Sequence, residues 1–571
     1  MKQATLNHVF RLVWSDRLQS FVPVAETERR GRRGASIRRR LARAALGALL
    51  VPALAWADGV KVAPGSGGTR VYQAPNGVTV VDIDKANGQG LSHNKCLDYN
   101  VNKKGLVLNN GSLANGTQQQ SQLAGQILSN ANLDKNARVI LNEVVAANRS
   151  QLSGFTEVVG DKADVVLANQ YGITCNGCGF INTDRVTLTT GRPDIRNGVL
   201  QGFNVERGQI LIHGQGLNAT NQDYFDLVAR SVKLDGMVNA RDLRITAGAS
   251  DWDYASREAS AVDGDEPAPE LALDSTALGG MYADRIYIHA TESGVGVRML
   301  GDAAASGADF RLTAAGQIEV GGDISAQRDV ALATSQSGQQ ALVLNNARIS
   351  AKRDASLHAT GEARLTGGTL TADGTFSANV GSLNDQASQT QGEFNNQRYG
   401  AAGVAMNISG NATLNGTGWT SDGAQQWTLA SLDVAALGTT LYGDTVALTA
   451  TDAGLALGDA KIIANQDLSL RARQDITTGD GEEQAISSRD GDVRIDTDTT
   501  LNNQGHIVAG GNTSPGNVTV NAKEGVDNQG TLAGTGDTTV ATDGLVDNSG
   551  ILGGNGATTV RGRTGARASA L

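Results

Sequence analysis

Two cysteines, Cys175 and Cys178, are the residues whose type and spacing most directly suggest chemistry, in the string TCNGCGF. A CxxC pair can form a disulfide, act as a redox centre or supply half of a zinc site. A zinc site needs a second ligand pair, and none follows nearby in the sequence. Asn-Gly between the cysteines favours the tight turn that a short bridge requires, so we expect a structural disulfide, with redox and metal chemistry as alternatives. Cys96 is left over, and we expect a buried thiol there.

Signatures of other catalytic chemistry are missing from the sequence. It contains no GxxxxGK[ST] and no HExxH, the patterns of a phosphate-binding loop and of a zinc protease, and its six histidines are scattered. A polysaccharide lyase with acidic and basic residues along a groove is a weak alternative. We therefore expect a protein that is not an enzyme, with no metal and no cofactor.

The first 57 residues read as a targeting segment. From Arg38, a basic cluster leads into an apolar run of about 11 residues, too short for the ~20 that span a bilayer. Small residues then follow at Ala55 and Ala57, the pattern that signal peptidase requires, so we predict cleavage before Asp58. Export to an oxidising periplasm favours the disulfide over free thiols.

The charge of the remaining chain is acidic. The whole chain carries −10 and the first 57 residues +8, which leaves −18 on the other 514 residues. An acidic surface repels phosphate backbones, so nucleic acid is not an expected partner.

The composition and the short apolar runs predict an all-β fold. Glycine is frequent, at 72 residues, whereas proline is rare, at 8, and aromatic residues make up only 4%. Short runs with apolar alternation, such as Val186–Thr189 and Leu243–Thr246, end at Gly, Asn or Asp, which is the pattern of strands and turns. Two stretches with mixed periodicity, 123–128 and 139–145, could instead form a short helical turn.

Repeats near the end of the chain indicate how such strands are arranged. Asn503, Asn528 and Asn548 each begin an Asn-x-Gly string, at separations of 25 and 20 residues. A repeat of about 20 residues built from short strands predicts a right-handed parallel β-helix, because one coil cannot bury its apolar face alone. Stacked asparagine amides can bond from coil to coil. Asp329, Asp354 and Asp373 mark a similar repeat, and the expected inward-facing residues include Leu501, Ile507, Val518 and Val520.

One acidic segment, 251–270, interrupts the repeat with the sequence DWDYASREASAVDGDEPAPE. Its charge and two prolines favour a solvated loop that protrudes from the solenoid over a calcium or substrate site.

Several strings resemble a known family. They include PNGVTVVDI and GLSHNKCLDYNVNKKGLVLNN within 75–110, ANQYGITCNGCGFINTDRVTLTTGRP at 168–193, and DSTALGGMYADRIYIHATESGVGVR at 274–298. Together they look like the secretion domain of the filamentous haemagglutinin family, the exoproteins of two-partner secretion. The segment ahead of the apolar run resembles the extended signal peptide of such proteins. The resemblance implies an N-terminal β-helix cap, recognised by the periplasmic domains of a cognate outer-membrane β-barrel transporter.

Two short motifs usually characterise this secretion domain. Here they stand as Asn-Ala-Asn-Leu at 130–133 and Asn-Gln-Tyr-Gly-Ile at 169–173, and each lacks the proline of the family pattern. Because proline fixes φ, we expect somewhat looser turns. The motifs could recognise the transporter or could simply be β-helix turns. The candidate recognition residues are Asn130, Asn132, Leu133, Asn169, Tyr171, Gly172 and Ile173.

These observations divide the chain into four parts: an extended signal peptide at 1–57, a secretion domain at 58–300, haemagglutinin-type β-helix repeats at 301–560 and an irregular tail at 561–571. The tail is basic and carries no junction of the kind that precedes a toxin domain in some family members. We therefore expect a shortened exoprotein, secreted or held at the surface of a Gram-negative bacterium. The leading hypothesis is an adhesin with an unknown receptor on host cells or bacteria, and the alternative is the truncated stalk of a contact-dependent growth inhibition effector that lacks its toxin domain.

Overall fold

The structure is a computed structural model that describes residues 10–15, 20–25, 59–390, 393–395, 397–435, 438–481, 485–511 and 513–563. The chain divides into two compact units, Met1–Trp56 and Ala57–Leu571. In the first unit, β1 (Phe10–Ser15) and β2 (Ser20–Ala25) form an antiparallel pair. Ala55, Ala57 and Asp58, the residues of the expected cleavage site, lie outside the described residues. Among the described residues, no helix is long and apolar enough to cross a membrane.

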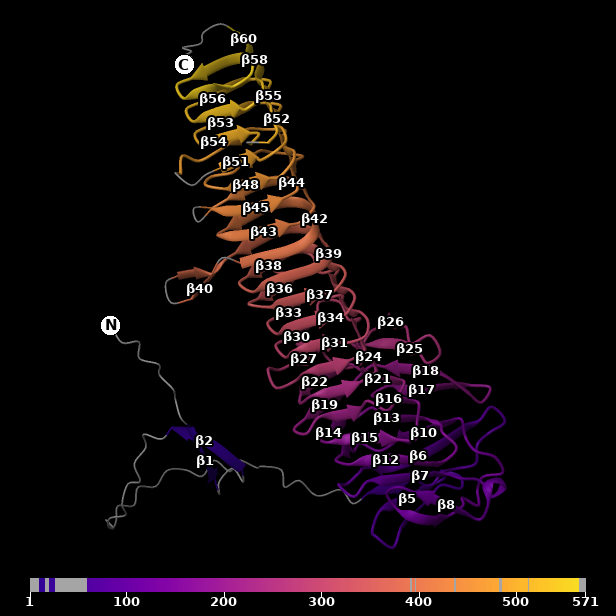
Figure 1. Ribbon diagram of the computed structural model, residues 1–571. Helices are drawn as coiled ribbons and strands as arrows, with labels where there is room; N and C mark the ends of the chain where they lie inside the picture. Colours follow the sequence, from indigo (N-terminus) through magenta and orange to yellow (C-terminus); the bar gives the residue numbers. More distant parts are fainter. Residues whose placement is uncertain are drawn as a thin grey trace, which may run out of the picture. The chain divides into compact units, whose positions relative to one another are not determined.

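The second unit is a right-handed parallel β-helix, as the repeats predict (Figure 1). Each coil contributes strands to three parallel ladders, here called A, B and C. Ladder A runs through β10 (Val139–Val144), β13 (Asp164–Asn169), β16 (Arg185–Thr189), β21 (Tyr224–Ala229), β24 (Asp242–Ala247), β29 (Arg285–Ala290), β32 (Phe310–Ala314) and β35 (Val330–Thr334), and later through β46 (Thr445–Ala450), β49 (Leu468–Ala472), β52 (Val493–Thr497), β55 (Val518–Ala522) and β60 (Thr558–Arg563).

Ladders B and C run along the other two faces of the β-helix. Ladder B contains β11 (Ser150–Leu152), β14 (Ile173–Cys175), β19 (Gln209–His213), β22 (Ser231–Asp235), β27 (Leu271–Ser275), β30 (Gly296–Met299), β33 (Ile318–Val320), β36 (Leu342–Asn345), β47 (Leu455–Ala456), β50 (Ile476–Thr477), β53 (Thr500–Asn503) and β56 (Gly525–Asn528). Ladder C contains β12 (Phe155–Gly160), β15 (Cys178–Ile181), β20 (Leu217–Ala219), β23 (Val238–Ala240), β28 (Met281–Ala283), β31 (Ala303–Ala305), β34 (Asp323–Ala326), β37 (Arg348–Ala351), β43 (Thr417–Ser421), β45 (Thr439–Gly443), β48 (Lys461–Ala464), β51 (Ala485–Ser488), β54 (His506–Ala509), β57 (Thr531–Gly534) and β59 (Ile551–Gly554).

In the middle of the stack and again near its end, some strands continue around the corners of the coil. β39 (Thr369–Gln386) and β42 (Gln397–Asn415) each contribute to all three ladders. Ladders A and B share β38 (Ala355–Thr366), β44 (Ala424–Val434) and β58 (Thr538–Asn548).

The core is a column of inward-facing side chains that alternate with outward-facing ones along each strand. The predicted inward residues are confirmed: Leu501, Ile507, Val518 and Val520 have 0% exposure. Leu501 lies between Ile476 and Val526 of the neighbouring coils, and the other three occupy equivalent places in their ladders.

The asparagine repeat is also confirmed. The side-chain amide of Asn503 donates to Oδ1 of Asn528 at 2.7 Å, and Asn528 donates to Oδ1 of Asn548 at 2.6 Å. Each asparagine lies at the end of a ladder B strand, so the amides form a buried ladder along the stack. The separations of 25 and 20 residues are therefore single coils.

The first coils carry extra strands that form a cap. β3 (Val60–Val62) pairs antiparallel with β6 (Leu91–Tyr99), and β5 (Thr79–Asp82) pairs antiparallel with β4 (Arg70–Gln73) and parallel with β7 (Leu106–Asn110). β8 (Gln118–Ser121) and β9 (Gly125–Leu128) form a separate antiparallel pair. The only helical element among the described residues is one 3-10 turn, η1 (Leu113–Asn115).

The possible helical turns at 123–128 and 139–145 are wrong. β9 occupies 125–128 after a turn at 122–124, and β10 occupies 139–144. The mixed periodicity has a physical cause, because Ile140 points into the main core while Leu141 points outward into a second apolar cluster. A strand buried on both faces loses its alternation.

The acidic segment is a solvated loop only in part: residues 262–270 form no strand and are mostly exposed, whereas the first half of the segment contributes two strands. β25 (Ser250–Asp253) and β26 (Ala259–Ala261) join β17 (Arg192–Arg196) and β18 (Val199–Val205) in a four-stranded antiparallel sheet, here called the side sheet (Figure 1). Phe203 and Trp252 of the side sheet are buried against outward-facing Val166 and Val228 of ladder A. The side sheet shields these outward-facing apolar residues from water, which stabilises the fold.

The expected end of the repeats at residue 560 falls inside a strand. β60 continues the ladder to Arg563, and residues 564–571 lie outside the described residues.

Candidate functional site

The first predicted recognition motif forms a tight turn tied to the cap. Oδ1 of Asn130 accepts the N–H of Asn132 at 2.9 Å, and the backbone N–H of Leu133 donates to the Asn130 carbonyl at 3.1 Å. The side chain of Asn130 donates to the Ile83 carbonyl, and that of Asn132 donates to the Gly68 carbonyl at 2.7 Å. Asn130 and Leu133 are buried. The asparagine side chain therefore closes this turn without a proline.

The second motif repeats this hydrogen-bond pattern at another corner of the coil, at the end of β13. Oδ1 of Asn169 accepts the N–H of Tyr171 at 2.9 Å, and its amide donates to the Asn148 carbonyl of the preceding coil. Gly172 has φ +105°, and a Cβ there would lie 2.8 Å from the Gln209 carbonyl oxygen. Ile173 is buried in the core, whereas Tyr171 is 42% exposed.

Most residues of the two turns have a structural role, and few of them are exposed. Most of the seven candidates make internal hydrogen bonds or pack in the core, so their first role is to hold the coils together. No hydrogen bond joins one turn to the other within the described residues. Tyr171 is the motif side chain most open to a partner.

A disulfide joins Cys175 and Cys178 at the corner between ladders B and C. Their Cα atoms lie 5.5 Å apart, and both side chains are buried. Cys96 is a free buried thiol, and burial, together with nearby Asp98, raises its pKa to about 12. A thiol with that pKa is not a nucleophile at neutral pH.

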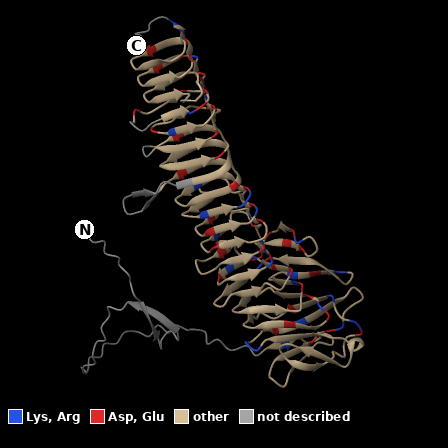
Figure 2. Ribbon diagram, in the orientation of Figure 1, with Lys and Arg blue, Asp and Glu red and all other residues tan. Residues whose placement is uncertain are grey.

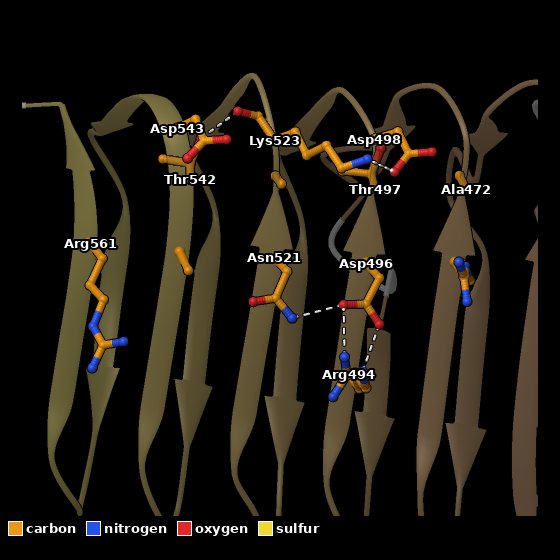
Figure 3. Close-up of a pocket in the computed structure, with 13 residues that line it drawn as sticks. Ala472, Arg494, Asp496, Thr497, Asp498, Asn521, Lys523, Thr542, Asp543 and Arg561 are labelled. Carbon is orange, nitrogen blue, oxygen red and sulfur yellow. Dashed lines mark hydrogen bonds and ion pairs between the residues drawn. The ribbon is translucent and has the colours of Figure 1, made fainter.

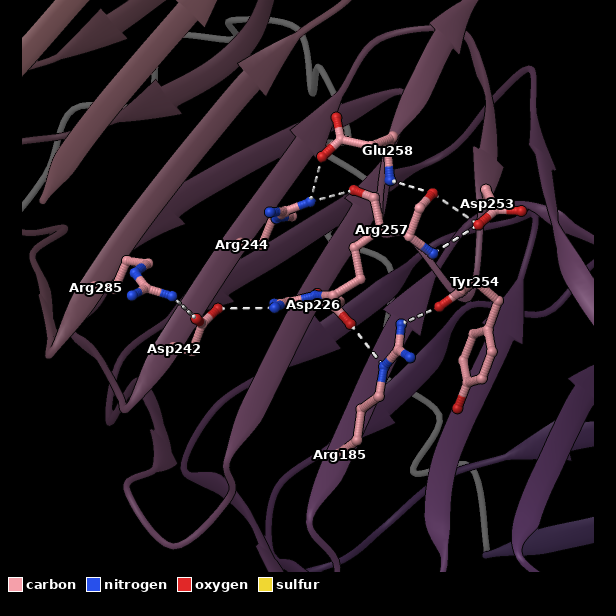
Figure 4. Close-up of polar contacts among 10 residues, drawn as sticks. Arg185, Asp226, Asp242, Arg244, Asp253, Tyr254, Arg257, Glu258 and Arg285 are labelled. Atoms are coloured by element: carbon pink, nitrogen blue, oxygen red, sulfur yellow. Dashed lines mark hydrogen bonds and ion pairs between the residues drawn. The ribbon is translucent and has the colours of Figure 1, made fainter. Parts of the chain in front are cut away.

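A network of opposite charges, buried except for Arg285, connects the side sheet to ladder A (Figure 4). Asp226, on β21, is fully buried and binds Arg185 of β16 at 3.1 Å and Arg257 at 2.7 Å. Arg257 also binds Asp242 at 2.9 Å, and Asp242 binds Arg285 at 3.2 Å. We call these five residues the charge clamp.

Arg257 is the residue that links the two layers. It lies between β25 and β26 with φ +62°, and its carbonyl oxygen accepts a hydrogen bond from Arg244 at 2.5 Å. Burial lowers its pKa, but the carboxylates of Asp226 and Asp242 outweigh this effect, so its pKa lies above the usual value. Arg185 additionally donates to the Tyr254 carbonyl and stacks on the Tyr254 ring at 3.9 Å.

Sequence reasoning did not find this network. Its partners are far apart in the chain, and the composition of the acidic segment predicts a solvated loop. Trp252 and Tyr254 carried a usable signal, because two aromatic residues within three positions are unusual in a chain with so few of them and indicate burial.

A hollow of about 600 Å³ lies on the outer face of ladder A in the later coils (Figure 3). Arg494 binds Asp496 at 2.6 Å within one strand, and Asn521 donates to Asp496 at 2.7 Å from the next coil. Lys523 binds Asp498 at 2.5 Å. Both carboxylates thus bind a cation, one within a strand and one in the next coil, and basic and acidic residues both occur along the ribbon of the stack in Figure 2.

The described residues contain no group of three or more His, Cys, Asp or Glu side chains that could hold a metal ion.

Two known protein families match parts of this chain. The family described as "TPS secretion domain" matches residues 58–320, and the "Extended Signal Peptide of Type V secretion system" matches residues 7–55. Similar curated proteins include the "16S rRNA endonuclease CdiA" of Enterobacter cloacae subsp. cloacae, 41% identical over 387 residues, covering 64% of this chain and 11% of the relative.

Two further relatives are the "tRNA nuclease CdiA" of Escherichia coli (strain STEC_O31), 40% identical over 366 residues, and the "tRNA nuclease CdiA-2" of Burkholderia pseudomallei (strain 1026b), 39% identical over 274 residues. These matches cover 61% and 48% of this chain, and 11% and 9% of the relatives. The chain therefore spans about a tenth of the length of these relatives. Among solved structures, the filamentous haemagglutinin secretion domain is 36% identical with a TM-score of 0.46, and the match covers 53% of this chain and 97% of that one.

Proposed function

We propose that this chain, which carries the TPS secretion domain and the extended signal peptide of type V secretion, acts as an adhesin of the filamentous haemagglutinin type. Such a domain implies a cognate outer-membrane transporter. The protein is accordingly exported through the periplasm of a Gram-negative bacterium and is secreted or held at the cell surface.

The observation that carries the adhesin proposal is the continuous solenoid joined to a secretion domain. Three ladders continue from the cap to Arg563, so the outward side chains of successive coils form long faces. A solenoid of this kind offers an extended binding surface without a deep pocket. We propose an unidentified receptor on host cells or on other bacteria.

The second candidate function is the stalk of a contact-dependent growth inhibition effector. The curated relatives that support it are named as toxins and nucleases, and they are about ten times longer than the part matched here. In this case the solenoid would present a toxic domain instead of being the adhesive element itself.

The proposed function is not enzymatic within these residues. In the hollow of Figure 3, Asp496 binds Arg494 and Asp498 binds Lys523, so these two carboxylates already have cationic partners. This arrangement gives little support to a polysaccharide lyase. An acidic exported chain also favours protein or carbohydrate partners over nucleic acid.

An adhesion and competition experiment tests the proposal. Bacteria that express the chain with its transporter should bind host epithelial cells or other bacteria more than bacteria with the transporter alone, and purified protein should compete for this binding. Growth of co-cultured target bacteria should be unchanged. Inhibition of the targets by the chain fused at its C-terminus to a growth-inhibiting domain, without adhesion by the unfused chain, would favour the stalk, and equal binding by both strains would refute the adhesin.

A further inference from the structure

The fold keeps the third cysteine of the chain away from the other two. Cys175 and Cys178 share one corner between ladders B and C. Cys96 lies on β6, which pairs with β10, and β10 pairs in turn with β13, the strand that precedes Cys175. Two ladder steps of about 4.8 Å each therefore separate Cys96 from the coil of the bridge, more than the ~7 Å between Cα atoms beyond which two cysteines cannot be joined.

This separation exists only in the folded chain. In an unfolded chain that enters an oxidising compartment, any two of the three thiols can be joined. A bridge from Cys96 to Cys175 would close a loop of about 80 residues, whereas Cys175 and Cys178 are only 3 positions apart. Because the entropic cost of loop closure rises with loop length, the local bridge is favoured on the order of a hundredfold.

The turn between Cys175 and Cys178 suits such a short bridge. Gly177 has φ +82°, a conformation that glycine adopts without strain. The N–H of Asn176 donates to the Leu152 carbonyl of the preceding coil at 2.8 Å, and the N–H of Gly177 donates to the Gly216 carbonyl of the following coil at 2.8 Å. The bridge therefore closes the same turn that the neighbouring coils bind in the folded protein.

We propose that the Cys175–Cys178 bridge forms in the periplasm, before the chain folds, and that it withholds both thiols from Cys96 so that the chain can leave through the transporter. This inference rests on the proposed export, with the chain passing as an extended strand. The local bridge leaves a single strand to pass, whereas a bridge to Cys96 would force two strands and the loop between them through together. After folding, Cys96 is buried with 1% exposure and no longer reaches the bridge.

The oxidation balances with one partner molecule. The two thiols lose two protons and two electrons, and the S–S bond forms between Cys175 and Cys178. The electrons reduce the disulfide of a periplasmic thiol oxidant, which leaves as a dithiol.

The test compares secretion of cysteine variants from a Gram-negative host that carries the cognate transporter. Cys178→Ser leaves Cys175 free to join Cys96, so this variant should lose most of its secretion. Its periplasmic form should migrate faster than the wild type on a gel without reductant, and at the wild-type position with reductant. Two matched controls also lack the native bridge: Cys175→Ser/Cys178→Ser and Cys96→Ala/Cys178→Ser. Both should be secreted at the wild-type level, because each has only one thiol left.

This comparison separates a wrong bridge from a loss of stability. Cys175→Ser/Cys178→Ser places two buried hydroxyls in the fold and Cys178→Ser only one, so a stability effect would order their secretion in the opposite way. Wild-type secretion of Cys178→Ser would overturn the proposal, as would an equal loss in both controls.

Alkylation gives the time at which the bridge forms. Wild-type protein trapped in the periplasm of cells without the transporter should be modified, without reductant, at Cys96 alone. Modification of all three cysteines would place the bridge after export and would overturn the proposal. Failure of the wild-type chain to be secreted when the transporter is present would instead refute export through this transporter.

Discussion

The secretion domain and the repeats use one coil design, but they stabilise it differently. In the secretion domain, ladder A neighbours such as Val186 and Phe225 are separated by a 39-residue step, because β17 and β18 lie between them. In the repeats, Val518 and Thr538 are 20 residues apart, which is one plain coil. The early coils therefore carry a second layer, which the described residues of the late coils do not.

The two regions also place their polar groups differently. The secretion domain concentrates charge in the buried clamp around Asp226. The repeats distribute polar contacts along the stack: Asp467, Asp492, Asn517 and Asp537 each accept a backbone N–H from the next coil. Local contacts of this kind make each coil depend mainly on its neighbours, whereas the clamp makes several coils and the side sheet depend on one another.

The largest expected effect follows from breaking the clamp. Asp226→Ala leaves Arg185 and Arg257 buried without this carboxylate, which should lower the free energy of unfolding by about 3–5 kcal/mol. Limited proteolysis should then cut within 254–270. The matched control in the repeats is Asp498→Ala, which removes an exposed ion pair with Lys523 and should change neither readout. Equal stability of the two variants would show that the clamp is no more important than a surface pair.

The next effect is a pH dependence in the repeats. Asp385 is fully buried and accepts hydrogen bonds from Tyr399 Oη at 2.8 Å and Trp419 Nε1 at 2.9 Å. Burial, only partly offset by these bonds, raises its pKa from 3.8 to about 6. The folded chain thus keeps a proton that the unfolded chain loses at lower pH. This group's contribution is fully present below about pH 4 and decreases by up to roughly 3 kcal/mol as pH rises through 6.

Chemical denaturation of the wild type and of Asp385→Asn between pH 4 and 7 measures this contribution. The variant has no proton to lose, so its stability should fall less with rising pH. Parallel pH curves for the two proteins would contradict the raised pKa.

A smaller effect is expected from the asparagine ladder. Asn528→Ala removes the bonds to Asn503 and Asn548 and leaves buried polar groups unpaired, which should cost about 2 kcal/mol. Hydrogen exchange should increase in the coils around residues 503–551. Asn502→Ala, at the outward-facing neighbour of Asn503, should leave exchange unchanged. Uniformly faster exchange over the whole chain would argue against coil-by-coil stability.

The smallest effect concerns the disulfide, which we place only in the secretion domain. Replacing Cys175 and Cys178 by serine should cost about 2 kcal/mol or less, because the loop is so short. Mass spectrometry after alkylation of the unfolded, unreduced protein should find a single modified thiol, at Cys96. Three modified thiols would refute the bridge.

Sequence patterns predicted the repeats well because their determinants are local. The spacing of Asn503, Asn528 and Asn548 and the alternation around Val518 and Val520 each report on one or two coils. The side sheet could not be predicted in this way. It pairs 202–205 with 250–253, and its core includes residues such as Val166 that look like ordinary strand residues in sequence.

The contacts of the two motif turns could not be predicted from the sequence either. Their positions follow from the resemblance, but the sequence does not reveal that Asn130 and Asn169 bond inward or that Gly172 lies with positive φ against the Gln209 carbonyl oxygen. These contacts join segments of different coils, and only the coil stacking brings them together.

Export tests the central claim most directly. The full chain should be expressed in a Gram-negative host with and without the cognate transporter, and the exported protein should be sequenced from its N-terminus. We predict that protein reaches the medium or the cell surface only with the transporter, and that it begins at Asp58. Export without the transporter, or exported protein that retains residues 1–57, would contradict the account.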